Sequence, residues 1–309
     1  MDKREAVLRL LDSGSPQTYV PAAFFLHFDR QFHAGPAAVE KHKEFFRSTG
    51  MDFVKIQFEV AFPQSAVNQP SDWSKLPPLG LDFFEPQLGV VRGLVKELGR
   101  EAPVVLTLYS PMMIAGHMGG EETLTRHLRE DPEAVAPGLK KVTDDLARFV
   151  EECVRIGLDG FYHSTQGGED RRFEDRSIFT KYVKSTDLRA IESAADCRFN
   201  ILHICDYNRD SFGGYRSLEP FLDYPGHVVN CNPEGQSLKQ VAALFGRPFM
   251  GGMERKGVLS KGSEEEVRQE ARRVLAERPD RFILGADCTV PGDTPWGNLR
   301  AAIEEAHRA

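Results

Sequence analysis

The sequence predicts an α/β protein with a (β/α)8 TIM barrel, in which eight parallel strands alternate with helices. Two observations predict this fold. Eight short apolar runs recur along the 309 residues, and amphipathic helical segments separate them. No G-x-G-x-x-G pattern stands at a strand–helix turn, which disfavours the runner-up, an open doubly wound sheet. No low-complexity linker divides the chain, so we expect a single domain over residues 1–309.

Eight apolar runs supply the predicted strands. They are short enough, and apolar enough, to be parallel strands that helices cover on the outside. They span residues 20–28, 52–58, 103–110, 160–166, 199–205, 226–232, 248–254 and 281–288. The segment between the second and third runs, residues 61–87, is rich in Pro, Ser and Asn. We expect this segment to cap the open end of the barrel.

Four of the predicted helices carry clear end signals. One of them stops at Gly50, another has Ser263 as its N-cap, and the last has Thr294 as its N-cap with Pro295 at its first position. These helices are expected over residues 35–50, 132–157, 263–280 and 294–309. Their positions between the apolar runs fit the strand–helix alternation of a barrel.

Composition and charge restrict the classes of function. The net charge of −7 argues against a general nucleic-acid or anionic-membrane binder. No apolar run reaches the length of a membrane span, and the charged N-terminus lacks the apolar core of a signal peptide. We therefore expect a cytoplasmic protein. Its five cysteines, an odd number in a long chain, do not indicate a disulfide framework.

Reactive residues gather where the predicted strands end, which is where barrels of this kind place their functional site. The residues at these ends include His27, Gln57, Glu59, Tyr109, Tyr162, His163, Gln166, His203, Cys205, Asp206, Asn232, Glu254, Asp287 and Cys288. Strand ends on one side of a closed sheet converge. The site is therefore expected at this end of the barrel.

Three of these residues form a candidate metal site. His203 and Cys205 stand two apart on one strand, so both side chains can face the same side. Cys288 ends the last predicted strand and can approach them across the open end of the barrel. Imidazole and two thiolates suit Zn²⁺, with one position left for substrate. The alternative is that these cysteines are small buried hydrophobic residues, which we expect for Cys153, Cys197 and Cys231.

Five segments resemble the uroporphyrinogen decarboxylase superfamily, and in the same order. They are SPMMIAGHMGG (110–120), GLDGFYHSTQGG (157–168), FNILHICDYN (199–208), FMGGMERKGVLSKGSEEEV (249–267) and FILGADCTVPGDTPWGNLRAAIEEA (282–306). The last segment is the most specific, because it joins a strand, Cys, Pro and Thr-Pro to an Asn-Leu helix. The resemblance implies a (β/α)8 barrel of the uroporphyrinogen decarboxylase type, with its cleft at the carboxyl ends of the strands.

The superfamily contains tetrapyrrole decarboxylases and zinc methyltransferases that serve corrinoid proteins and thiols such as coenzyme M. The methyltransferase signature is His-x-Cys, a long gap, then Cys, and the chain is similar in His203, Cys205 and Cys288. The decarboxylases have two arginines near the first strand. Here His27 stands near the first of these positions and Arg30 stands in for the second.

The resemblance implies a zinc-dependent transfer of a methyl group, from a methylcorrinoid on a partner protein, to a thiol. Glu59 or Glu254 is then a fourth ligand or a partner of His203, and Tyr162, His163 and Asn232 orient the substrate. His27, Arg30, Gln57 and Tyr109 complete the expected substrate-binding set.

Two alternatives stay open. One is a metal-free decarboxylase, a lyase in which Arg30, Glu59, Tyr109 and His163 hold a carboxylated tetrapyrrole. The other is a non-catalytic barrel that holds a corrinoid or a structural zinc. A homodimer is also expected from the resemblance, because dimers are common among the decarboxylases.

Overall fold

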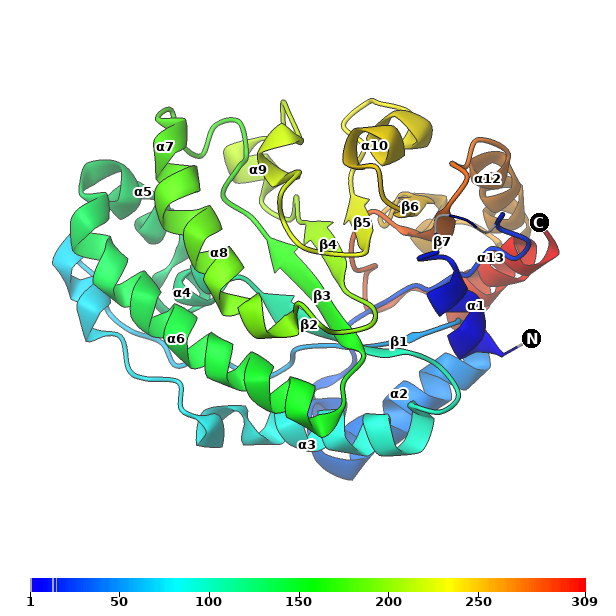
Figure 1. Cartoon of the computed structure of the whole chain (residues 1–309), viewed down its shortest axis with the longest axis horizontal. Helices are drawn as coiled ribbons and strands as arrows, with labels where there is room; N and C mark the ends of the chain where they lie inside the picture. The colour runs from blue at the N-terminus through cyan, green and yellow to red at the C-terminus, as the bar shows by residue number, and fades with distance from the viewer. Residues whose placement is uncertain (1, 13, 15) are drawn as a thin grey trace.

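The computed structural model describes residues 2–12, 14 and 16–309. Its centre is a parallel sheet of seven strands in chain order, curled so that helices cover its outer side (Figure 1). The strands are β1 (Val54–Ile56), β2 (Val104–Tyr109), β3 (Gly160–Thr165), β4 (Ile201–Ile204), β5 (Val228–Cys231), β6 (Phe249–Met253) and β7 (Phe282–Ala286). Each strand lies within one of the predicted runs. The α/β class and the parallel order are therefore confirmed.

The first predicted run, residues 20–28, does not form a strand, so the eight-stranded prediction is met only in part. Isolated parallel bridges join Ala22 to Leu284 in β7 and Leu26 to Val290. The carbonyl of Ala22 also accepts a hydrogen bond from Asp52, just before β1, at 3.0 Å. Pro21 has no backbone N–H to donate, and the hydrogen bonds of the segment alternate between its two neighbours. Because consecutive residues of this segment do not pair with the same neighbouring strand, no ladder of backbone hydrogen bonds forms over residues 20–28.

Helices follow most of the strands. They are α1 (Lys3–Arg9), α2 (Gly35–Thr49), α3 (Leu81–Leu98), α4 (Pro111–Gly119), α5 (Glu121–Glu130), α6 (Pro132–Ile156), α7 (Arg176–Ile178), α8 (Ser185–Ala190), α9 (Arg209–Phe212), α10 (Leu238–Phe245), α11 (Val258–Lys261), α12 (Glu264–Ala276) and α13 (Trp296–Arg308). Helix α2 ends at Gly50, whose φ of 79° is left-handed, and Ser263 caps α12 as predicted. Helix α13 begins one residue later than predicted, with Pro295 at its N-cap.

Only the first part of the segment 61–87 lies at the open end of the sheet, where the Phe62 ring stacks on His117 of α4 with centroids 5.7 Å apart. A 3-10 helix (Pro70–Lys75) packs against α6 instead, with the buried Trp73 indole donating a hydrogen bond to His127 Nδ1 at 3.0 Å. Helix α3 already begins at Leu81, so the irregular part is shorter than expected. Burial of the large apolar Trp73 side chain favours this position, because the side chain buries more surface between helices than it could at an open rim.

A buried aspartate joins both ends of the chain to the amino end of the sheet. Asp52 accepts hydrogen bonds from Tyr19 Oη at 2.7 Å and from the backbone of Ala22 at 2.8 Å. His307 Nε2 in α13 lies 2.8 Å from Asp52, and Lys3 Nζ in α1 lies 3.8 Å from it. These contacts stabilise the end of the molecule opposite the candidate site.

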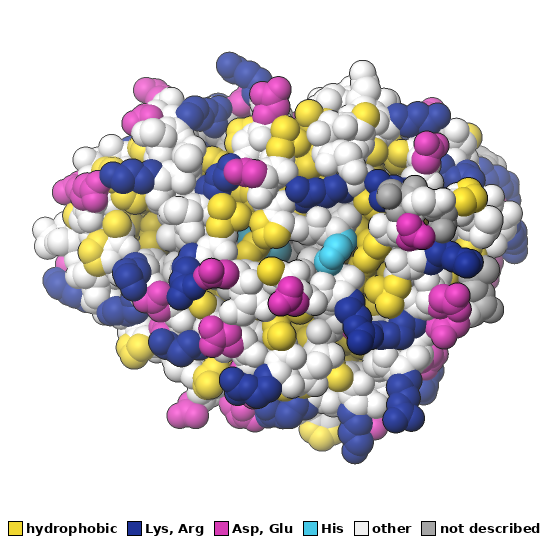
Figure 2. Space-filling view, in the orientation of Figure 1, with side chains coloured by type: hydrophobic (Ala, Val, Ile, Leu, Met, Phe, Trp, Pro, Cys, Tyr) yellow, Lys and Arg dark blue, Asp and Glu magenta, His cyan; other side chains and the backbone are white. Residues whose placement is uncertain are grey.

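Side chains alternate across each strand and divide into two sets. In β3, Phe161, His163 and Thr165 face the helices, whereas Tyr162 and Ser164 face the inside of the curl. Register places Ser164 beside His203, and His203 beside Asn230. The outer surface is mixed: Figure 2 shows acidic and basic side chains interspersed over this face. No helix in the described part of the chain is long and apolar enough to cross a membrane.

Candidate functional site

A cavity of about 490 Å³ lies at the carboxyl ends of the strands, inside the curl of the sheet. Polar side chains from six strands or the turns after them line it. They are Lys55, Gln57, Thr107, Tyr109, Tyr162, Ser164, His203, Cys205, Arg255 and Cys288, with His27, His117 and Tyr207 nearer the rim. This is the end of the sheet at which the sequence places the site.

Three of the predicted residues form a compact group in this cavity. One ligand atom each from His203, Cys205 and Cys288 lies within 4.8 Å of the others, and no other such group of His, Cys, Asp or Glu occurs among the described residues. His203 Nε2 is 3.4 Å from Cys288 Sγ. His203 Nδ1 is buried and has no hydrogen-bond partner in the part of the chain that the structure describes. A nitrogen and two sulfurs at this spacing suit a zinc ion.

Aromatic packing and hydrogen bonds that join four strands hold His203 in place. The Tyr162 ring stacks on its imidazole, with centroids 4.8 Å apart and 30° between planes. The Tyr162 hydroxyl donates to Asn230 Oδ1, and Asn230 Nδ2 donates to the carbonyls of Met250 and Ala286, each at 2.9 Å. The imidazole is therefore fixed by β3, β5, β6 and β7 together.

The two thiols of the group differ in acidity. The pKa of Cys288 is well below its usual value, because its thiolate accepts a hydrogen bond from Cys205 and lies beside His203 and Arg255; burial opposes the change. The pKa of Cys205 is raised well above its usual value by the hydrogen bond with Cys288 and by burial. Without a metal, one proton is thus kept on Cys205 and Cys288 ionises first.

Lys55 is a site residue that the sequence reading did not single out. Its side chain is buried in β1, with Nζ 4.5 Å from the centre of the Tyr162 ring and 4.8 Å from that of Phe25. Thr289 Oγ1 accepts from it at 3.5 Å, and no carboxylate in the described residues pairs with it. Burial lowers its pKa to about 7, opposed by the negative charge of Cys288. The sequence feature that could have indicated Lys55 as a site residue is its position inside the apolar run DFVKIQF.

Gln57 lies two residues from Lys55 and faces the same cavity. Its Oε1 accepts a hydrogen bond from the Thr107 hydroxyl at 3.1 Å. Its Nε2 is buried and has no acceptor in the described structure. Lys55 and Gln57 therefore present a cation and an amide N–H that both lack a carboxylate or carbonyl partner, and both face the cavity.

Glu59 pairs with histidines at the rim and not with the metal group. His27 Nδ1 lies 3.0 Å from Glu59 Oε1, and His33 Nε2 lies 3.7 Å from Glu59 Oε2. The His27 side chain is 46% exposed. Tyr109 lines the cavity between this rim and the group.

Besides Glu59, four predicted site residues do not line the cavity. His163 faces the helix layer, where burial lowers its pKa to about 3 and neither ring nitrogen has a hydrogen-bond partner among the described residues. Arg30 and Glu254 are exposed. Asn232 donates to Asp206 at 3.3 Å. The alternation of side chains along β3 explains why His163 does not line the cavity, since its neighbours Tyr162 and Ser164 take the inner positions.

Arg255 lines the cavity where Glu254 was expected to. Its guanidinium donates to Asp287 and lies 3.0 Å from Asp206. Arg209 also pairs with Asp206, at 2.9 Å. The positive charge of Arg255 is thus balanced by two carboxylates, and it stabilises the turns after β4 and β7 that carry Cys205 and Cys288.

The remaining cysteines belong to the core. Cys153, Cys197 and Cys231 are buried and free, and burial is the main cause that raises the pKa of each thiol. They are not part of the group formed by His203, Cys205 and Cys288. This agrees with the small-hydrophobic role expected for them.

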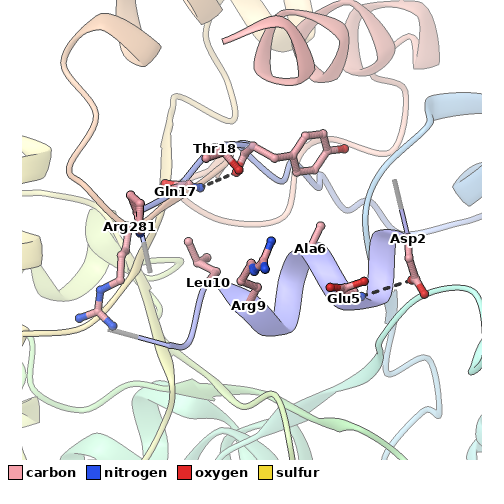
Figure 3. Close-up of a pocket in the computed structure, with 10 residues that line it drawn as sticks. Asp2, Glu5, Ala6, Arg9, Leu10, Gln17, Thr18 and Arg281 are labelled. Atoms are coloured by element: carbon pink, nitrogen blue, oxygen red, sulfur yellow. Dashed lines mark hydrogen bonds between the residues drawn. The ribbon is translucent and has the colours of Figure 1, made fainter. Parts of the chain in front are cut away.

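A second cavity, of about 250 Å³, lies at the opposite end of the sheet (Figure 3). It is formed by α1 and the segment around Gln17, which exchanges hydrogen bonds with the backbone of Phe282 at the start of β7. Figure 3 shows Arg9, Leu10 and Arg281 around it. Among the described residues, it holds no cluster of metal-ligating side chains.

The sheet and the site together define an α/β enzyme with a His/Cys/Cys group at the carboxyl ends of its strands. The family profile of uroporphyrinogen decarboxylase (URO-D) matches residues 48–309, and the chain belongs to this family. The match includes every strand and all three residues of the group.

Named relatives of the chain are methyltransferases. A methylated-thiol–coenzyme M methyltransferase from Methanosarcina mazei is 23% identical, over 90% of this chain and 77% of that protein. The solved structure of a methyltransferase from Methanosarcina mazei superposes with a TM-score of 0.76 at 15% identity, covering 100% of this chain and 99% of the other. A B12-independent methionine synthase from a Shewanella species gives 0.62 at 14% identity, over 94% and 97% of the two chains. At such identity the structural matches establish the fold.

Proposed function

We propose that the protein is a zinc-dependent methyltransferase that moves a methyl group to a thiol. The observation that carries the proposal is the convergence of His203, Cys205 and Cys288, with their ligand atoms within 4.8 Å. These residues would hold the metal. A zinc ion there supplies a Lewis acid that keeps a substrate thiol ionised at neutral pH. The name of the Methanosarcina relative supports a thiol as the methyl acceptor.

The residues around the group support a way to orient the substrate. The Tyr162 ring stacks on the His203 imidazole, and the Lys55 amine lies 4.5 Å from the centre of the same ring. Lys55 donates only to the Thr289 hydroxyl, at 3.5 Å, and Gln57 Nε2 has no acceptor among the described residues. We infer that they bind an acceptor-bearing end of the substrate, while its sulfur lies at the group.

The methyl donor is proposed to be a methylcorrinoid carried by a partner protein. The resemblance to corrinoid-dependent methyltransferases supports it, and the cavity is open at a rim formed by His27 and by Tyr207, which is 76% exposed. A metal-free decarboxylase is less favoured. Arg30 lies outside the cavity and Arg255 is neutralised by two carboxylates, so Lys55 is left as the buried cation for a substrate with many carboxylates.

Zinc content and thiol methylation test the proposal together. Protein purified without chelators is expected to hold one zinc per chain and to methylate a thiol from methylcobalamin. Cys205→Ala and Cys288→Ala should lose both properties while keeping the far-UV circular dichroism of the native protein. Cys197→Ala, a cysteine outside the cavity, is the matched control and should keep both. Zinc and activity that survive in both cavity variants would contradict the proposal.

A further inference from the structure

Gln166 lies directly behind the proposed metal group and contacts one of its two sulfurs. It follows β3, is buried, and its Nε2 donates to Cys205 Sγ at 3.5 Å. It does not line the cavity. No substrate contact therefore explains a buried amide at this position.

The polarity of this hydrogen bond is fixed by a chain of side chains that begins at a buried arginine. Arg172 Nη2 donates to Glu121 Oε1 at 2.8 Å, and a carboxylate only accepts. Asn208 Nδ2 donates to the same Glu121 oxygen and also to Gln166 Oε1, at 3.1 Å. Gln166 must therefore turn its oxygen to Asn208 and its N–H group to the sulfur.

Arg172, the first residue in this series of hydrogen bonds, is itself held in place by several contacts. Arg172 is fully buried and donates to both carboxylate oxygens of Glu169, at 2.8 and 2.7 Å. Glu169 Oε2 accepts from the backbone of Gly167 at 2.8 Å. Gly167 has a φ of +100°, and a Cβ there would lie 2.9 Å from Met112 Sδ. The turn that positions Gln166 is thus fixed on both sides.

The two sulfurs differ in their partners. Cys205 Sγ accepts a hydrogen bond from the Gln166 amide, at 3.5 Å. Cys288 has His203 and Cys205 beside it, and no amide N–H among its closest partners in the described structure. If a metal were held by the imidazole and both thiolates, the Gln166 N–H group, which Asn208 orients, would still point to Cys205. A thiolate that accepts an N–H group has its charge stabilised and is a weaker nucleophile.

We propose that Gln166 is a positioning residue that protects Cys205 from methylation, so that the substrate thiolate and not this ligand attacks the methyl group. The inference rests on the proposed function. In the unwanted reaction, the Cys205 sulfur would form the S–CH₃ bond with its own electron pair, and the leaving group would depart with the pair of the broken bond. A methylated Cys205 would no longer be a thiolate ligand.

The test is alkylation of the zinc-loaded protein by iodomethane without any substrate thiol, with peptide mass spectrometry to locate the methyl group. In the native protein, methylation is expected mainly on Cys288. In Gln166→Leu, the ratio of methylated Cys205 to methylated Cys288 should rise about tenfold, the factor expected for one lost hydrogen bond to a charged group. Asn208→Ala, which frees the amide to rotate, should give a smaller rise in the same ratio.

Gln57→Leu is the matched control, because it removes an amide from the cavity wall that bonds to no sulfur. Its methylation ratio should equal that of the native protein. If Gln166→Leu binds zinc with an unchanged ratio, the protective role is wrong and the proposed function stands. If the native protein binds no zinc, the proposed function fails and this inference fails with it.

Discussion

His203 Nε2 lies 3.4 Å from Cys288 Sγ although the two residues are 85 positions apart in the sequence. The contact spans the inside of the curled sheet, from the end of β4 to the turn after β7. It exists because parallel strands place all their carboxyl ends on one side. The neighbouring residues either support this contact or surround it.

Lys55→Met should weaken the binding of thiols that carry a carboxylate or sulfonate by about tenfold or more, the effect of losing a hydrogen bond to a charged group. Binding of an uncharged thiol of similar size should change little. The pKa of Lys55 is about 7, so the ammonium is present below this pH and is lost above it. Affinity for an anionic thiol, measured by calorimetry from pH 6 to 8, should therefore fall with rising pH in the native protein only. Equal losses for charged and neutral thiols would contradict this role.

His163→Phe should leave methyl transfer unchanged, since His163 faces the helix layer. Its folded pKa is about 3, below the ordinary value of 6.5, because burial disfavours the cation. The unfolded chain therefore takes up a proton first as pH falls, and the native protein loses stability between about pH 6.5 and 3. Urea denaturation at pH 7 and pH 5 should show a smaller loss in His163→Phe. A drop in activity with unchanged stability would return His163 to the site.

Tyr162→Phe should keep zinc and lose stability by about 1 kcal/mol, because it removes the hydrogen bond to Asn230 but retains the ring. Tyr162→Leu should in addition weaken zinc binding, since the imidazole of His203 loses the surface on which it stacks. Competition with a zinc chelator measures the difference. Identical zinc affinity in the two variants would show that the ring does not position His203.

Glu59→Gln and Glu254→Gln should both retain one zinc per chain. Glu59 lies against His27 and His33, and Glu254 is exposed, so neither belongs to the group that includes His203. Metal analysis after dialysis checks this expectation. Loss of zinc in one variant would identify its carboxylate as a fourth ligand that moves on binding.

Much of the fold could be predicted from the hydrophobic pattern and the helix-end residues of the sequence. Seven of the eight apolar runs became strands, and Gly50 and Ser263 end and begin helices where their chemistry requires it. The run at residues 20–28 has the composition of a strand, but Pro21 and its alternating partners prevent a ladder. Such competition between two neighbouring strands depends on tertiary geometry that periodicity does not contain.

The candidate site divides in the same way. His203, Cys205 and Cys288 could be chosen because spacing and ligand chemistry agree. His163 could not be separated from Tyr162, since only the register of β3 decides which side chain faces the cavity. Arg255 and Lys55 could not be predicted as site residues for a related reason. Charged residues at strand positions are usually expected at the rim, and here both side chains face the cavity.

X-ray absorption spectroscopy at the zinc edge tests the central claim most directly. Zinc-loaded native protein should show two sulfur ligands at about 2.3 Å and at least one imidazole nitrogen at about 2.0 Å. Addition of a substrate thiol should raise the sulfur count by one, and Cys288→Ala should lower it by one or abolish binding. A zinc shell of oxygen and nitrogen without sulfur, or less than about a tenth of a zinc per chain after reconstitution, would contradict the account.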